Sequence, residues 1–153
     1  MVVISIVRRT QLSAEEAWVR LTDWERHGEF IPLTRVSSAE PLQDRAGSAF
    51  VARTSLGPFG FDDPMEVTFW QPPTAGNAGV CRVVKRGRIV LGWAALAVTP
   101  TRAGSTVSWQ EAVSYRLVGD LFALPNRIVG RKLFGRLVDG LLADGGPSNA
   151  SQL

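Results

Sequence analysis

Between residues 33 and 116 the chain is divided by turn-forming residues into short segments that are rich in β-branched and aromatic side chains. Gly and Pro recur between these segments, which is typical of the connections between strands. The segments predicted to be strands are 34–41, 48–56, 61–71, 79–86, 88–99 and 105–116. Because strands that follow one another through short turns pair with each other, this region predicts an antiparallel meander with one covered face.

One more strand and two short helices are predicted before the meander. Residues 2–10 are rich in β-branched side chains and predict a first strand. Ser13 and Glu16 have the spacing of a capping box, which predicts a helix over 14–22. Asp23 can cap a second short helix directly afterwards.

A long amphipathic helix is predicted over residues 120–144, opened by Asp120. Its apolar stripe is predicted to consist mainly of Leu121, Leu124, Ile128, Leu137, Leu141 and Leu142. Gly130, Gly135 and Gly140 interrupt this helix, although an interior glycine costs about 0.5–1 kcal/mol relative to alanine. These glycines indicate close approach to the strands, room for a ligand beside the helix, or tolerated surface positions.

Alternation along the strands predicts which side chains face the covered side of the sheet. In the last strand Trp109, Val113 and Tyr115 fall on one face, and Glu111 lies in register with them. The aligned residues of strand 61–71 are Phe61, Met65, Val67 and Phe69. The sheet therefore presents an apolar, partly aromatic face, which the final helix is long enough to cover.

Five short stretches carry a resemblance to a known superfamily: AEEAW at 14–18, TDWERH at 22–27, FIP at 30–32, GRIVLGW at 87–93 and GSTVSW at 104–109. With the order of the elements, they resemble the helix-grip fold of the START and pollen-allergen-like superfamily. Within it the chain looks most like the bacterial polyketide cyclase/dehydrase and lipid-transport branch. The resemblance implies an α+β fold in which a curved seven-stranded antiparallel sheet wraps around the C-terminal helix and encloses an apolar cavity.

This resemblance implies no single activity, because members bind, carry or cyclise different ligands on one scaffold. We expect binding or transport of a small hydrophobic or aromatic ligand, such as a lipid, an isoprenoid or a polyketide-like compound. The alternative is a polyketide aromatase/cyclase or dehydratase-like enzyme that works by positioning and one acid/base residue. The residues predicted to contact the ligand are His27, Phe30, Arg53, Phe61, Met65, Trp93, Trp109, Glu111, Tyr115 and Phe134.

Glu111 is the candidate acid or base. A lone carboxylate on an inward apolar face costs several kcal/mol to bury, so it must be partnered, protonated or close to water. Arg53 is a possible partner, and Arg82 and Arg88 are others. The sequence leaves open whether Glu111 belongs to a structural ion pair or acts on a ligand.

Other chemistry-bearing residues do not combine into a recognisable site. His27 is the only histidine, and the carboxylates near it fall on different faces of a short helix, so we expect no metal. Cys81 is the single cysteine and is expected to pack as a small apolar residue. Asp62 and Asp63 are neighbours in a strand, so their side chains diverge. We expect no cofactor.

The charge balance limits the partners that the chain can bind. Seventeen Lys and Arg residues against fourteen Asp and Glu residues give a net charge of +3, too small to predict nucleic-acid binding. A basic stretch on the final helix predicts either a solvated face or transient contact with an anionic membrane surface. Its members are Arg127, Arg131, Lys132 and Arg136. We expect a cytoplasmic monomer or weak homodimer, with one ligand-binding domain over 1–144 and a flexible tail over 145–153.

Overall fold

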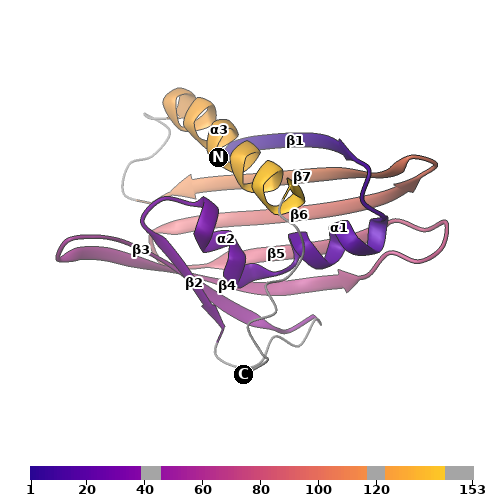
Figure 1. Cartoon of the computed structure of the whole chain (residues 1–153). Coiled ribbons are helices and arrows are strands. Elements are labelled where there is room, and N and C mark those ends of the chain that lie inside the picture. Colours follow the sequence, from indigo (N-terminus) through magenta and orange to yellow (C-terminus); the bar gives the residue numbers. More distant parts are fainter. Residues whose placement is uncertain (39–45, 117–122, 144–153) are drawn as a thin grey trace, which may run out of the picture.

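The computed structural model describes residues 1–38, 46–116 and 123–143, which form an antiparallel sheet with helices against one face (Figure 1). In chain order the elements are β1 (Val2–Thr10), α1 (Ala14–Leu21), α2 (Trp24–Phe30), β2 (Thr34–Ser38), β3 (Ala49–Leu56), β4 (Phe59–Gln71), β5 (Gly79–Arg86), β6 (Val90–Thr101), β7 (Gly104–Tyr115) and α3 (Ala123–Ala143). The predicted α+β fold class and order of elements are confirmed. Residues 39–41 and 120–122, and the tail predicted at 145–153, lie outside the described residues, as does the side chain of Leu124.

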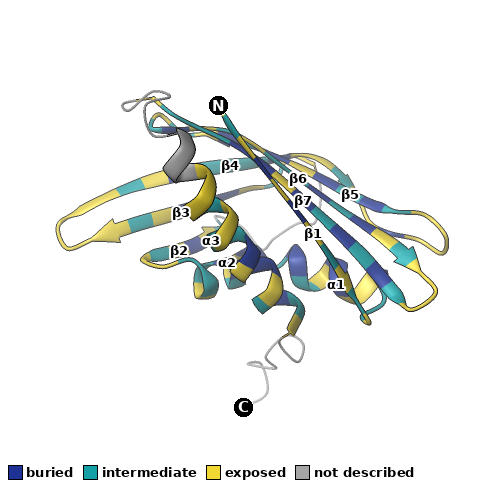
Figure 2. Ribbon diagram, turned by 90° about the horizontal axis from the view of Figure 1, so that it is seen from above, coloured by how far each residue is buried: buried dark blue, intermediate teal, exposed yellow. Residues whose placement is uncertain are grey.

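The strands of the described sheet lie in the order β1-β7-β6-β5-β4-β3-β2. Each neighbouring pair is antiparallel, so β2 to β7 form the predicted meander. The chain crosses from the β1 edge to the β2 edge through α1 and α2, which leaves β1 to pair with β7. Figure 2 shows the sheet curving around the helices, so that its concave face and α3 enclose the interior.

The local signals at the two short helices have different outcomes. The Ser13 hydroxyl accepts a hydrogen bond from the Glu16 amide at 3.1 Å, and the Ser13 amide donates to the Glu16 carboxylate at 3.0 Å. The predicted capping box is therefore confirmed. Asp23 is the N-cap residue of α2, but its side chain makes no capping hydrogen bond, so that part of the prediction is wrong.

The second half of α3 closes the core. Leu137, Val138 and Leu141 are fully buried, and burying a side chain of this size stabilises a fold by roughly 1.5–3 kcal/mol. Ile128 is instead 58% exposed, so its predicted place in the buried stripe is wrong. Successive helix residues are separated by about 100°, which turns Ile128 away from the side that carries Leu137.

Strand β4 contains an irregularity that the alternation did not predict. The register with β5 shifts between Val67 and Phe69, as in a β-bulge. The shift turns Phe69 outward, where it is 43% exposed and lies under the Arg82 guanidinium. Trp70 turns inward and meets the ring of Trp18 edge-on, with ring centroids 4.9 Å apart. The predicted inward position of Phe69 is therefore wrong.

Two glycines allow α3 to lie close to its neighbours. A Cβ at Gly130 would lie 2.5 Å from Cδ1 of Ile4, and one at Gly140 would lie 2.3 Å from the Phe30 ring. Both distances are too short for real atoms, so close approach to β1 and α2 explains these glycines.

None of the helices in the described part of the chain is long and apolar enough to span a membrane.

Candidate functional site

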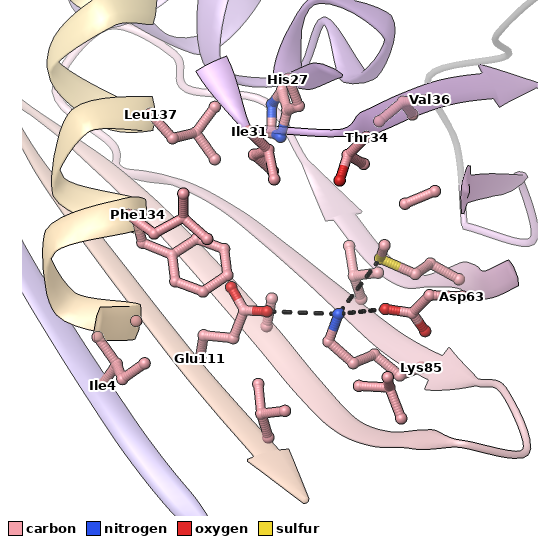
Figure 3. A pocket seen from close by; sticks show the side chains of 18 of the residues that line it. Ile4, His27, Ile31, Thr34, Val36, Asp63, Lys85, Glu111, Phe134 and Leu137 are labelled. Atoms are coloured by element: carbon pink, nitrogen blue, oxygen red, sulfur yellow. Dashed lines mark hydrogen bonds and ion pairs between the residues drawn. The ribbon is translucent and has the colours of Figure 1, made fainter. Parts of the chain in front are cut away.

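A cavity of about 230 Å³ lies between the concave face of the sheet and helices α2 and α3 (Figure 3). Its walls are mainly apolar, with a small group of polar side chains, which is the composition typical of small-molecule sites. Among the residues predicted to contact a ligand, those in its wall are His27, Phe61, Met65, Trp109, Glu111, Tyr115 and Phe134. Ligand contact by these residues stays a prediction.

Phe30, Arg53 and Trp93 do not line the cavity, which corrects their predicted placement. Phe30 packs beside α3, against the core. Ala52 of β3 faces the cavity, so its neighbour Arg53 points to the other face, where it pairs with Asp62 at 2.8 Å. Trp93 lies on the outer face of β6 and is 36% exposed. A strand's neighbouring residues face opposite ways, so a shift of one residue moves a side chain out of the cavity.

Three buried charged side chains lie together in the wall and are here called the triad: Asp63 of β4, Lys85 of β5 and Glu111 of β7. The Lys85 Nζ lies 2.8 Å from Asp63 Oδ2 and 3.3 Å from Glu111 Oε1 (Figure 3). The Trp109 indole donates a hydrogen bond to Glu111 Oε2 at 3.2 Å. The side chains of Asp63, Lys85 and Glu111 are 9%, 7% and 3% exposed. Lys85 is therefore the partner of Glu111, and the predicted partner Arg53 is wrong.

Burial and the ion pairs together determine the charges of the triad. Burial alone would lower the pKa of Lys85, but the Glu111 and Asp63 carboxylates outweigh it and hold that pKa above its ordinary value. Burial raises the pKa of Glu111, and the opposing effects of Lys85 and the Trp109 indole offset only part of this change. Lys85 is therefore a cation at neutral pH, and it faces two carboxyl groups that have little access to water.

His27 is held by the backbone as a neutral ring. Its Nε2 lies 2.9 Å from the Leu21 carbonyl oxygen, and because a carbonyl only accepts, Nε2 carries the proton. Burial lowers the pKa of His27 to about 4. The rings of Trp24 and Trp109 both contact it, with centroids 5.2 and 5.7 Å away. His27 thus shapes the cavity wall as an uncharged ring.

Cys81 lines the cavity without the properties of a nucleophile. Burial raises the pKa of the Cys81 thiol to about 12, so the reactive thiolate is rare at neutral pH. Within the described ranges, no group of three or more His, Cys, Asp or Glu side chains is arranged to hold a metal ion.

Sequence reasoning missed Lys85, and it set Asp63 aside. A signal for Lys85 was present, because strict alternation along 79–86 puts Lys85 on the same side as Cys81 and Val83, which are buried. Lysine is rarely buried unless it is paired, so an inward lysine predicts an inward carboxylate close to it. For Asp63, its divergence from Asp62 was predicted correctly, but its pairing with a residue 22 positions away needed the strand register.

Comparison with known proteins identifies the architecture. No family model matches the chain, and no curated protein matches it. Solved structures do match. A STAR-related lipid transfer protein from Xanthomonas axonopodis is 14% identical, with a TM-score of 0.66 over 90% of this chain and 84% of that one. The ZhuI aromatase/cyclase from a Streptomyces species is 13% identical, with a TM-score of 0.62 over 95% and 98% of the two chains.

Human STARD10 is 9% identical, with a TM-score of 0.64 over 86% of this chain and 59% of that one. At such identities the likeness defines the fold and no activity. The chain therefore has the helix-grip fold that these structures share, as its sequence motifs predicted.

Proposed function

We propose that the protein binds and carries a small hydrophobic or aromatic molecule in the cavity under α3. The observation that carries this proposal is the cavity itself, whose apolar walls come from almost every element of the fold. The rings of Trp109 and Phe134 lie nearly parallel in its wall, 20° apart in orientation, with centroids separated by 6.4 Å. Burying apolar ligand surface against such walls is favourable by roughly 25 cal/mol per Å².

The volume of the cavity limits the size of the ligand. About 230 Å³ is just below the range of roughly 300–1,000 Å³ that is usual for drug-sized ligands. A compound with one or two rings, or a short isoprenoid, suits this volume better than a long acyl chain. The presence of a lipid transfer protein and an aromatase/cyclase among similar structures supports an apolar ligand in general terms.

A pair of substitutions on one strand tests the proposal. Ala94 of β6 lines the cavity, whereas its neighbour Ala95 faces the other side of the sheet. We expect Ala94→Phe to fill the cavity and to weaken binding of ethylnaphthalene at least about tenfold, while Ala95→Phe leaves binding unchanged. Equal binding by both folded variants would contradict the proposal. If the two variants differ as expected, native mass spectrometry of protein purified from its own host can identify the natural ligand.

The triad favours a second candidate function, an aromatase/cyclase or dehydratase-like enzyme. A carboxyl group with a raised pKa beside a buried ammonium can exchange a proton with a ligand that the walls position. If Glu111 acts in this way, Glu111→Gln should lower turnover by about 10²–10⁴-fold while the ligand still binds. In a carrier, the same change should alter affinity by no more than roughly 0.5–1.5 kcal/mol, the contribution of one hydrogen bond.

We further propose that one end of the molecule contacts an anionic membrane surface when the ligand is exchanged. In Figure 1 the tip of the β3–β4 hairpin and the N-terminal half of α3 both lie toward the left of the molecule. Leu56 and Phe59 at the hairpin tip are 68% and 79% exposed, and Val129 of α3 is exposed while also lining the cavity. Arg127 and Arg131 are exposed on the same part of α3 as Val129, so exposed basic and apolar side chains lie together beside the cavity.

Vesicle binding tests this contact. A basic residue near an anionic surface contributes about 1 kcal/mol, so Arg127→Gln/Arg131→Gln should weaken binding to phosphatidylserine-containing vesicles about tenfold or more. Arg9→Gln/Arg102→Gln is the matched control, because Arg9 and Arg102 are exposed at the opposite end of the sheet. Equal losses in both double variants would show a nonspecific charge effect and contradict the proposed surface.

A further inference from the structure

The ammonium group of Lys85 has one contact that is much weaker than the others. An ammonium carries three N–H groups. The Lys85 Nζ contacts Asp63 Oδ2 at 2.8 Å and Glu111 Oε1 at 3.3 Å, and its third contact is the Met65 Sδ at 3.8 Å. A thioether sulfur is a weak acceptor. Among the described residues, this buried cation thus has one N–H direction without a strong acceptor.

The Lys85 ammonium, which makes this weak third contact, lies in the wall of the cavity. Lys85, Met65 and Glu111 all line the cavity. Figure 3 shows the Lys85 Nζ at the centre of the polar contacts, with Phe134 of α3 across the cavity beside Glu111. A ligand that rests its apolar part against the aromatic wall can therefore bring an oxygen to Nζ and replace the sulfur as acceptor.

The same triad disfavours a negatively charged ligand. Two carboxyl groups already face one ammonium, and Asp63 Oδ1 is buried without a hydrogen bond to the described residues. A ligand carboxylate would add a third acidic group where there is little water to screen the charges. Repulsion and desolvation both oppose this, whereas a neutral oxygen introduces no charge.

We propose that Lys85 determines ligand specificity, and that the cavity selects apolar ring compounds bearing one neutral acceptor oxygen, a ketone, ester or hydroxyl group placed on Lys85 Nζ. Carboxylate-bearing compounds, fatty acids among them, are rejected. This inference rests on the proposed binding function and adds to it the chemical class of the ligand.

Three probes of similar shape distinguish a failure of this selectivity from a failure of the proposed binding function. Ethylnaphthalene, acetonaphthone and naphthoate share a ring system and differ in the group that would reach Lys85. Calorimetric titration of the wild-type protein at neutral pH should show acetonaphthone binding about tenfold more tightly than ethylnaphthalene, because a hydrogen bond to a charged donor is stronger than a neutral one. Naphthoate should bind at least about tenfold more weakly than acetonaphthone.

The matched variant replaces all three residues of the triad with uncharged side chains of similar shape. In Asp63→Asn/Lys85→Met/Glu111→Gln, the preference for acetonaphthone over ethylnaphthalene should fall to within about twofold, since the charged donor is gone. Met65→Leu conserves volume and removes only the sulfur acceptor, so it should keep or increase that preference. A preference that persists in the folded triple variant, or disappears in Met65→Leu, overturns the role of Lys85.

The outcomes with wild-type protein are distinct. If none of the three probes binds, the proposed function fails and the inference fails with it. If ethylnaphthalene binds as tightly as acetonaphthone, or naphthoate binds as tightly as either, the cavity is a binding site but its proposed selectivity is wrong.

Discussion

Lys85 is a buried cation that faces two acidic side chains, Asp63 and Glu111. Removing one member of a buried ion pair costs about 3–5 kcal/mol, because the remaining charge has no compensation. We therefore expect Lys85→Met to lower the free energy of unfolding by about this amount, measured by urea denaturation. Arg53→Met is the control, since the Arg53–Asp62 pair is exposed and its loss should cost no more than about 1 kcal/mol. Similar losses in both variants would contradict the buried triad.

His27 makes stability depend on pH in a defined direction. Its pKa is about 4 in the folded protein against an ordinary value of 6.5, so the unfolded state binds more protons between these values. The stability that neutral His27 contributes is complete above about pH 6.5 and is lost as the pH falls toward about 4. Between pH 7 and pH 4.5 the wild type should lose about 2–3 kcal/mol more than His27→Gln, measured by denaturation at each pH. Parallel pH profiles of the two proteins would show that His27 is not buried as a neutral ring.

The polar residues of the site show what alternation along a strand predicts and where it fails. Glu111 could be placed on the inward face because Trp109 and Tyr115 lie in register with it on a long regular strand. Its partner could not be derived in the same way. Lys85 is two strands away from Glu111, and their distance depends on the register of β5, β6 and β7 together. A chain of pairings decides such a contact, and each pairing can slip by one residue.

At the scale of elements, the glycines of α3 determine how closely the helix can approach the rest of the fold. Gly140→Ala places a methyl group into the Phe30 ring, and we expect a net loss of about 1–3 kcal/mol despite the better helix propensity of alanine. Gly135→Ala is the matched change, because its Cβ would meet only the far end of Arg8, at 3.3 Å. It should be neutral or stabilising by up to about 1 kcal/mol, measured by thermal unfolding. A larger loss at Gly135 than at Gly140 would contradict this packing of α3.

Element boundaries were predicted more successfully than the faces of the elements. Gly and Pro mark most ends of the strands, and the capping box marks the start of α1, because these signals act through local backbone geometry. The inward residues of β4 after Val67 could not be predicted, since the bulge there depends on pairing with β5. Ile128 was misassigned for a related reason. Apolar residues at helical spacing define more than one possible stripe, and contact with β1, α1 and α2 selects among them.

At the scale of the whole molecule, the sheet, its curvature and α3 create a space that no single element contains. The order of the elements and five short motifs were sufficient to predict the helix-grip fold, because that order leaves few ways to cover one face of an antiparallel sheet. The size of the cavity could not be predicted, since it is what remains after every inward side chain has been placed. The aromatic wall and the triad give this space an apolar surface that carries one cluster of buried charged side chains.

The central claim is that the cavity holds an apolar ring compound whose oxygen contacts Lys85. The crystal structure of the wild-type protein with acetonaphthone bound tests this claim most directly. We expect the ring system inside the cavity, against Trp109 and Phe134, with the ketone oxygen about 2.7–3.2 Å from Lys85 Nζ. Ring density confined to the outer surface, or a ketone oxygen directed away from Lys85, would contradict it.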